Sequence, residues 1–173
     1  KLQQVGLEAL AGKAGAAVAQ NPETGEVLAL VSSPSFDPGV FTSQNQLELA
    51  KLFKNESKPL FNRAIGGAYP PGSTYKIVSA VAGLESGAIS SEFVYEDRGF
   101  VEVGGRVFNN WFYTMRGGVE GTVGVARAIT RSTDTFFYTL GELTGVNSLV
   151  KYSHEFGVGE LARVDLPGEV EGL

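Results

Sequence analysis

Residues 69–76 combine a tight turn, a serine and a lysine at a spacing that can build a nucleophile. Two prolines and a glycine precede Ser73, and the apolar run at residues 77–84 indicates that a helix follows. Ser73 therefore lies in the first turn of this helix, and Lys76, three residues later, lies on the same face. The unpaired N–H groups of a helix N-terminus can hold an oxyanion. An uncharged lysine amine can take the serine proton, so the pattern predicts a serine nucleophile with an amine base.

The bare Ser-x-x-Lys spacing is a weak signal, because a chain of this composition contains about one such match by chance. The alternative interpretation of Ser73 and Lys76 is an ordinary helix N-terminal serine followed by a solvated lysine. The position directly behind Pro70-Pro71-Gly72, at the start of a helix, favours the chemical interpretation.

A second polar group, Ser132-Thr133-Asp134, lies between two apolar helical runs. Taken alone, this pattern is typical of a helix cap, and Asp134 is predicted to be the N-cap of the second helix. In a chain that also carries Ser73 and Lys76, the group can instead offer a hydroxyl and a carboxylate to a shared cleft.

The composition restricts the classes of protein to which the chain can belong. Its 173 residues suit one globular domain, and 43% of them are hydrophobic. A net charge of −5 offers no basic stripe for phosphates, which argues against a nucleic-acid partner. One histidine and no cysteine argue against a metal site and exclude disulfides, so we expect neither metal nor cofactor. No apolar run reaches the roughly 18 residues of a membrane span.

The first part of the chain is predicted to contain a helix, a hairpin and a second helix. The helix covers residues 2–10, and the strands cover residues 16–20 and 26–31, joined by the turn residues Asn21-Pro22-Glu23-Thr24-Gly25. The second strand is apolar throughout, so we expect both of its faces to be covered. A further helix is predicted from about Gln44 to Lys54, with Leu47, Leu49, Leu52 and Phe53 on its inner side.

The later part of the chain is predicted to be mainly helical. Gly104-Gly105 indicates a small hairpin at residues 101–107, and the aromatic residues at 111–115 are interpreted as a core plug or as a substrate-binding lip. Apolar periodicity predicts helices at residues 123–131, at 134–145 and from Asn147 to a stop at Gly157. Residues 165–169 are predicted to be a loop.

Several segments together resemble the transpeptidase domain of class B penicillin-binding proteins, and most of all the penicillin-binding protein 2 group. They are Phe61-Asn62-Arg63-Ala64-Ile65, Tyr69-Pro70-Pro71-Gly72-Ser73-Thr74-Tyr75-Lys76-Ile77, Ser132-Thr133-Asp134-Thr135-Phe136-Phe137-Tyr138, Asp165-Leu166-Pro167-Gly168-Glu169 and the opening hairpin at residues 21–30. The resemblance covers the chain from end to end. It implies an α+β fold of the penicillin-binding protein transpeptidase or serine β-lactamase type: an antiparallel five-stranded sheet with helices on both faces, a helical lobe, and the active site between them.

The resemblance also implies a reaction, the cross-linking of peptidoglycan stem peptides that end in D-Ala-D-Ala. Ser73 attacks the carbonyl of the penultimate D-alanine and expels the terminal D-alanine, and the amine of a neighbouring stem then takes the acyl group. Lys76 is the base toward Ser73, Ser132 relays a proton toward the leaving nitrogen, and Asp134 holds Lys76 and the substrate amide. β-Lactams leave a stable acyl-enzyme on Ser73.

Two departures from the family pattern bear on this mechanism. Many members carry Asn where this chain has Asp134, although Asp also occurs in the penicillin-binding protein 2 group. A carboxylate favours the charged form of a neighbouring amine, so the proton is expected to be shared among Lys76, Ser132 and Asp134. The family's third motif, Lys-Thr-Gly or Lys-Ser-Gly, is absent from residues 1–173. We therefore expect the N-terminal part of a single transpeptidase domain, truncated before the third-motif strand, with weak or no activity alone and an exposed sheet edge.

Two other interpretations remain open. A class D β-lactamase or a β-lactam sensor domain also uses Ser-x-x-Lys, although those families usually carry another residue where Asp134 stands. A non-catalytic scaffold fragment of the cell-wall machinery is the second, and the missing third motif supports it. His154 has Ser153 and Glu155 as neighbours that point elsewhere on a helix, so a Ser-His-acid triad is not supported.

The resemblance further implies partners and a location. The implied partners are stem peptides, β-lactam antibiotics, the missing C-terminal part of the domain, a cell-wall glycosyltransferase and elongation proteins. The implied location is the periplasmic or extracellular face of the cytoplasmic (inner) membrane, with an anchor upstream of these residues.

Overall fold

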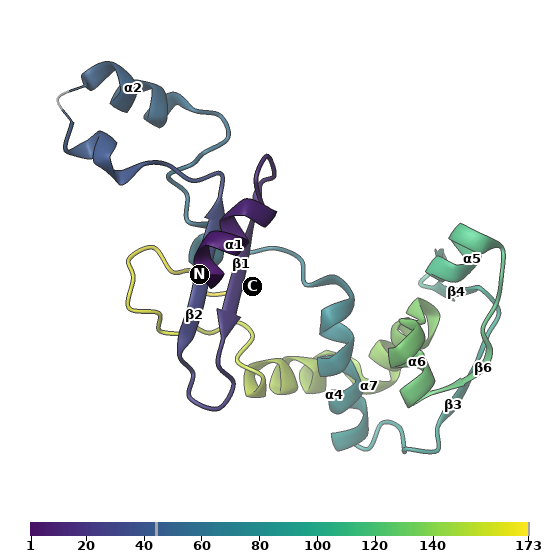
Figure 1. Ribbon diagram of the computed structural model, residues 1–173. Coiled ribbons are helices and arrows are strands. Elements are labelled where there is room, and N and C mark those ends of the chain that lie inside the picture. Colours follow the sequence, from purple (N-terminus) through teal and green to yellow (C-terminus); the bar gives the residue numbers. More distant parts are fainter. Residues whose placement is uncertain (44, 173) are drawn as a thin grey trace. The chain divides into compact units, whose positions relative to one another are not determined.

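The computed structural model describes residues 1–43 and 45–172 and divides into two compact units (Figure 1). The first unit comprises Lys1–Ala68 and Leu161–Glu171, and the second comprises Tyr69–Glu160 together with residue 172. Within the described ranges, no helix combines the length and the apolar character that crossing a membrane requires.

The first unit begins with a helix and a β-hairpin, as the sequence predicts. Helix α1 (Leu2–Ala9) precedes the antiparallel strands β1 (Gly15–Gln20) and β2 (Val27–Ser33), in which Ala17 pairs with Val31. Gly25 has a positive φ of 76° in the connecting turn, a conformation that glycine adopts without steric cost. These three predicted elements are confirmed with small shifts in their bounds.

Strand β2 is covered less completely than its apolar sequence indicates. Ala29 and Val31 are buried, whereas Leu28 is 44% exposed. Helix α1 packs against β2, and Gly6 lies against Val31. The prediction that both faces of β2 are covered is therefore wrong. Among the residues that the structure describes, β1 pairs with another strand along one edge only, which leaves its other edge unpaired.

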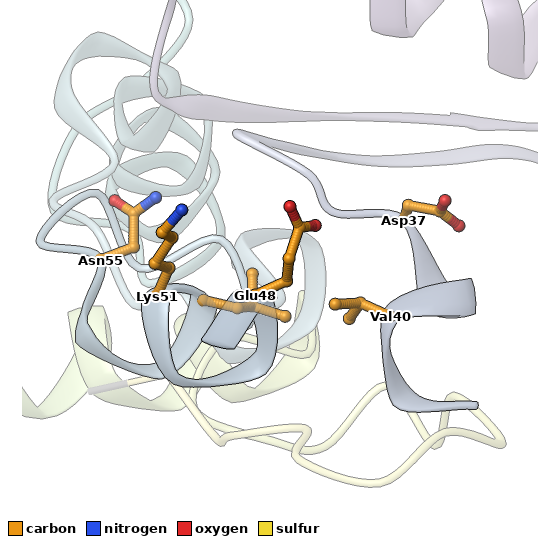
Figure 2. Close-up of a pocket in the computed structure, with 6 residues that line it drawn as sticks. Asp37, Val40, Glu48, Lys51 and Asn55 are labelled. Atoms are coloured by element: carbon orange, nitrogen blue, oxygen red, sulfur yellow. The ribbon is translucent and has the colours of Figure 1, made fainter. Parts of the chain in front are cut away.

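Short helices follow β2 in the first unit. They include the 3-10 helix η1 (Pro38–Phe41) and α2 (Gln46–Lys54), and the chain then continues to α3 (Arg63–Gly66). The predicted helix is confirmed up to Lys54, but its expected start at Gln44 lies outside the described residues. Its predicted apolar inner side is wrong for Leu47 and Phe53, which are each 66% exposed, whereas Leu49 and Leu52 are half-buried. A hollow beside α2 is lined by Asp37, Val40, Glu48, Lys51, Leu52 and Asn55 (Figure 2).

The second unit is built around the packing of α4 (Lys76–Glu85) against α7 (Asp134–Glu155) (Figure 1). Gly83 lets these two helices approach closely, since a Cβ at this position would lie 2.5 Å from Leu140 Cδ1. The buried core around this contact consists of Ala80, Ile89, Val123, Ala128, Phe136, Phe137 and Leu140. The second unit therefore has a hydrophobic core made of its own residues.

Two small sheets belong to the same unit. Strand β3 (Val94–Asp97) pairs with β6 (Gly121–Gly124), and β4 (Phe100–Val103) forms the predicted hairpin with β5 (Arg106–Asn109). The helix predicted at residues 123–131 begins only at α6 (Val125–Arg131), because backbone pairing with β3 holds residues 121–124 in a strand.

Helix α5 (Trp111–Arg116) corrects the prediction of a buried aromatic plug, because Trp111 is 37% exposed and Met115 is 73% exposed. The predicted break between the last two helices is confirmed, since Gly145 has a non-helical φ of 74° inside α7. Residues 165–169 form a loop, as predicted.

Candidate active site

Ser73 lies in a 3-10 turn that leads directly into α4. This turn, η2 (Gly72–Tyr75), starts at a glycine with a φ of 57°, and the Thr74 hydroxyl closes it by donating to the Pro71 carbonyl at 2.6 Å. Lys76 is the first residue of α4. The turn–helix junction predicted from the Pro-Pro-Gly pattern is therefore present, with Ser73 in the 3-10 turn and not in the α-helix. Ser73 is exposed, as a nucleophile that must meet a substrate requires.

Ser132 approaches Ser73 because α6 ends in a left-handed turn. Ser132 is the C-cap of α6 with φ 53° and ψ 44°, and the N–H of Thr133 bonds back to the carbonyl of Ala128 at 2.9 Å. A residue other than glycine in this conformation costs about 1 kcal/mol. The turn places Ser132 Oγ 3.0 Å from Ser73 Oγ, with the Ser132 hydroxyl donating. The strained backbone is thus found where two polar residues must meet.

The Lys76 side chain connects these two serines to Asp134. Its Nζ donates to the carbonyl oxygen and to Oγ of Ser132, each at 2.9 Å, and to Oδ1 of Asp134. These three acceptors match the three N–H bonds of an ammonium group. In this arrangement Lys76 reaches Ser73 through the Ser132 hydroxyl, and not through the direct contact that the spacing predicts.

Asp134 does not act as the predicted N-cap, because its carboxylate is engaged elsewhere. Oδ1 accepts from Lys76, and Oδ2 accepts from the backbone N–H of Trp111 at 3.0 Å. Thr133 occupies the N-cap position of α7. The Asp134 side chain is 24% exposed and that of Lys76 is 15% exposed, so the ion pair is mostly screened from water. Burial, together with the negative charge of Asp134, raises the pKa of the Tyr138 phenol above its ordinary value.

A hollow of about 330 Å³ opens beside this group. Its lining residues are Ser73, Trp111, Thr130, Arg131, Ser132 and Asp134. The indole N–H of Trp111 donates to the Arg131 carbonyl at 2.9 Å, and the Arg131 guanidinium lies 5.5 Å from the indole ring. Trp111 therefore lines one side of the hollow, which is consistent with the predicted substrate-binding lip. Arg131 was not predicted, and its position directly before Ser132 is the one sequence signal that points to it.

The structure therefore brings together Ser73, Lys76, Ser132 and Asp134, the four residues that the sequence selects. His154 lies apart from them, with its Nδ1 3.8 Å from Glu160 Oε1 and its side chain 56% exposed. The four residues form a continuous chain of hydrogen bonds from the Ser73 hydroxyl to the Asp134 carboxylate. Such a chain can move a proton away from the first hydroxyl and return it to a leaving group.

The chain matches a family model and several proteins along nearly its whole length. The family described as Penicillin binding protein transpeptidase domain matches residues 15–173. Peptidoglycan D,D-transpeptidase MrdA of Acinetobacter baumannii is 42% identical over an alignment of 175 positions, which covers 99% of this chain and 25% of that protein.

Solved structures match with comparable coverage. Pseudomonas aeruginosa PBP2 in complex with WCK 5153 has a TM-score of 0.90 at 38% identity, over 99% of this chain and 37% of that chain. The penicillin G acyl-enzyme complex of penicillin-binding protein A from M. tuberculosis has a TM-score of 0.85 at 33% identity, over 98% and 41%. PBP2 in its complex with MreC from Helicobacter pylori has a TM-score of 0.89 at 31% identity, over 99% and 32%.

The chain thus spans about a quarter of the length of the A. baumannii relative. The predicted α+β transpeptidase fold is confirmed by these structural matches. With a family model that matches all but the first 14 residues, the chain belongs to the penicillin-binding protein transpeptidase family.

Proposed function

We propose that the chain is the N-terminal part of a peptidoglycan D,D-transpeptidase domain with Ser73 as its nucleophile. The observation that carries this proposal is the connection from Ser73 Oγ through Ser132 Oγ to Lys76 Nζ, in two steps of 3.0 and 2.9 Å. The name of the A. baumannii relative and the penicillin G acyl-enzyme of the M. tuberculosis protein support it.

The proposed acylation follows this connection. When the Lys76 amine is neutral, the Ser73 proton passes to Ser132 Oγ while the Ser132 proton passes to Lys76 Nζ. Ser73 Oγ then attacks the carbonyl of the penultimate D-alanine, and the tetrahedral intermediate collapses with cleavage of the C–N bond. The proton held by Lys76 returns through Ser132 to the leaving nitrogen, and free D-alanine departs. No proton is gained or lost over these steps. In the hydrogen bonds that the structure shows, the Lys76 amine donates to three acceptors, as its protonated form does.

The fate of the acyl-enzyme depends on the compound that acylated Ser73. For transpeptidation, the amine of a second stem peptide attacks the ester carbonyl and forms the amide cross-link. The ester C–O bond breaks, and the proton lost by the amine passes through Lys76 and Ser132 to Ser73 Oγ. With a β-lactam, the C–N bond of the four-membered ring breaks, and the nitrogen takes the proton but stays tethered to the acyl group through the other ring carbons, so no leaving group departs. Asp134 contributes in both cases by holding Lys76 beside Ser132.

We propose that the domain continues beyond residue 173, since this chain covers only 25% of the A. baumannii relative. The backbone N–H of Ser73 can supply one oxyanion donor, and the strand with the family's third motif would supply the second. Loss of one such donor costs about a hundredfold to a thousandfold in rate. We therefore propose that residues 1–173 alone are acylated slowly or not at all.

The partners and the location are proposed from the same relationship. The complex of H. pylori PBP2 with MreC supports elongation proteins as partners. We further propose stem peptides as substrates, a cell-wall glycosyltransferase as a partner, β-lactams as inhibitors, and a place outside the cytoplasmic membrane with an anchor upstream.

Intact-mass spectrometry after incubation with penicillin G tests the proposal. We expect the full-length gene product to gain one drug mass, and Ser73→Ala to gain none. Residues 1–173 are measured in parallel and are expected to gain little or none. Absence of an adduct on the full-length product would contradict the proposal and favour a scaffold. Rapid loss of the adduct with release of hydrolysed drug would favour a β-lactamase.

A further inference from the structure

Asp97 is a fully buried carboxylate at the end of β3, outside the four residues proposed for the chemistry. It is 1% exposed, and each of its oxygens accepts two hydrogen bonds. Oδ1 accepts from the Gly99 backbone at 3.0 Å and from the Thr135 hydroxyl at 2.7 Å. Oδ2 accepts from the Asn110 amide at 3.0 Å and from the Glu120 backbone at 2.8 Å. All four donors are neutral, so this anion is held by dipoles that come from four separate segments.

The buried carboxylate stays ionised because these donors outweigh its burial. Removal from water raises the pKa of Asp97, while the bonds from Glu120, Thr135, Gly99 and Asn110 lower it, and the net pKa lies below the ordinary value. Loss of one hydrogen-bond donor would leave the buried charge partly unsatisfied and would cost free energy of folding. The carboxylate therefore holds each of its four donors in place.

Two of these donors lie directly against Asp134. Asn110 is fully buried, and its amide nitrogen is committed to Asp97, so its amide oxygen faces the backbone N–H of Asp134 at 3.3 Å. The next residue, Trp111, donates its backbone N–H to the Asp134 carboxylate. Thr135, the other donor, follows Asp134 in the first turn of α7. Asp97 thus holds the residues on both sides of the Asp134 carboxylate.

We propose that Asp97 is a positioning residue that fixes the orientation of Asp134 toward Lys76 and thereby sets the rate at which Ser73 is acylated. This inference rests on the proposed function of the same site. Asp97 touches neither Lys76 nor the serines through any of its four hydrogen bonds, so its effect passes through Asn110, Trp111 and Thr135. Small displacements of a catalytic group cost one to two orders of magnitude in rate, which is the size of effect that such a residue can have.

Acylation kinetics of the full-length gene product with a fluorescent penicillin separate positioning from binding. The dependence of the rate on drug concentration gives the non-covalent dissociation constant and the first-order acylation rate. Asp97→Asn keeps the shape of the side chain but turns an –NH₂ group toward at least one donor. We expect the acylation rate to fall about tenfold to a hundredfold while the dissociation constant changes less than about twofold. The matched control is Glu96→Gln, which changes the neighbouring carboxylate on β3, bonded to Thr122 at the surface, and is expected to keep the parental rate.

Two further variants keep the test decisive if Asp97→Asn fails to fold. Thr135→Val removes one donor with nearly the same side-chain shape and is expected to lower the acylation rate about threefold to tenfold. The double variant Asp97→Asn/Asn110→Asp exchanges amide and carboxylate, retains an acceptor for the Asp134 N–H, and is expected to recover part of the lost rate.

The outcomes separate this inference from the proposed function. If the parent is not acylated at Ser73, the proposed function fails and the inference fails with it. If the parent is acylated and a folded Asp97→Asn keeps the parental acylation rate, the inference alone is overturned. It is also overturned if Asp97→Asn is unfolded and a folded Thr135→Val keeps that rate, or if the loss appears in the dissociation constant and not in the acylation rate.

Discussion

The two compact units differ in the size of their buried apolar core, although both carry exposed apolar side chains, such as Met115 in the second unit. In the second unit, Val123, Phe136 and Leu140 are completely buried in a core that forms where α4 and α7 pack together. In the first unit, Val18, Leu28, Leu47 and Phe53 are between 44% and 66% exposed, and β1 offers an unpaired edge within the described ranges. The unit that carries Ser73, Lys76, Ser132 and Asp134 therefore contains the packing that positions them. The first unit presents surfaces that suit association with other segments.

The largest expected effect comes from removing a core side chain of the second unit. Leu140→Ala deletes buried methyl groups against Gly83, and we expect the free energy of unfolding to fall by about 3 kcal/mol. Leu47→Ala in α2 is the matched control and should change the free energy by less than about 0.5 kcal/mol, because the side chain is 66% exposed. Urea unfolding followed by far-ultraviolet circular dichroism, which reports the helices of both units, measures both. Equal losses in the two variants would contradict the contrast between the units.

The next largest effect is expected from interrupting the proposed proton path between Ser73 and Lys76 in the second unit. Ser132→Ala removes the hydroxyl between Ser73 and Lys76 but leaves the contact between Lys76 and Asp134. We expect the acylation rate of the full-length product by penicillin to fall about a hundredfold. Ser86→Ala, at the C-terminal end of α4, should keep the parental rate. A parental rate in Ser132→Ala would show that Lys76 acts on Ser73 directly.

A smaller effect concerns the pH dependence of the stability of the second unit. The folded pKa of Asp97 lies below its unfolded value, so this carboxylate contributes stability above the unfolded pKa, near 4. That contribution is lost as the pH falls through the lower folded pKa. In urea unfolding at pH 7 and at pH 3, the difference between the parent and Asp97→Asn should therefore shrink at the acidic pH. A difference that grows on acidification would mean that burial of Asp97 dominates over its hydrogen bonds.

The sequence predicts most helices and hairpins here, because their signals are local. Gly25 and Gly104-Gly105 mark turns, and apolar periodicity marks α4 and α7. The strand at residues 121–124 was missed because its partner, β3, lies more than 20 residues away, as the pairing of Tyr95 with Val123 shows. The aromatic plug was wrong because composition does not distinguish an aromatic residue in the core from one at the rim of a hollow.

The candidate site also contains some residues that local sequence signals reveal and others that depend on tertiary contacts. Ser73 and Lys76 are recognisable because they share one turn and helix, and Ser132 and Asp134 because they accompany that motif. Asn110 and Trp111 bond to Asp134, and Asp97 bonds to Asn110, only through tertiary contacts between β3, the start of α5 and α7. No spacing within the sequence specifies these contacts, so they become visible only in the folded structure.

The smallest expected effect lies in the first unit, where one side chain replaces a strand partner. The Gln3 amide donates to the carbonyl of Leu30 and accepts from its N–H, each at 2.8 Å, which imitates a neighbouring strand along β2. Gln3→Ala should cost about 1 kcal/mol and lower the hydrogen-exchange protection of the Leu30 amide. Gln4→Ala is the control, because Gln4 bonds only within α1, to Glu8, and should leave Leu30 protected. If Leu30 remains protected in Gln3→Ala, another group covers this edge of β2, and the first unit is better closed than its exposed apolar side chains indicate.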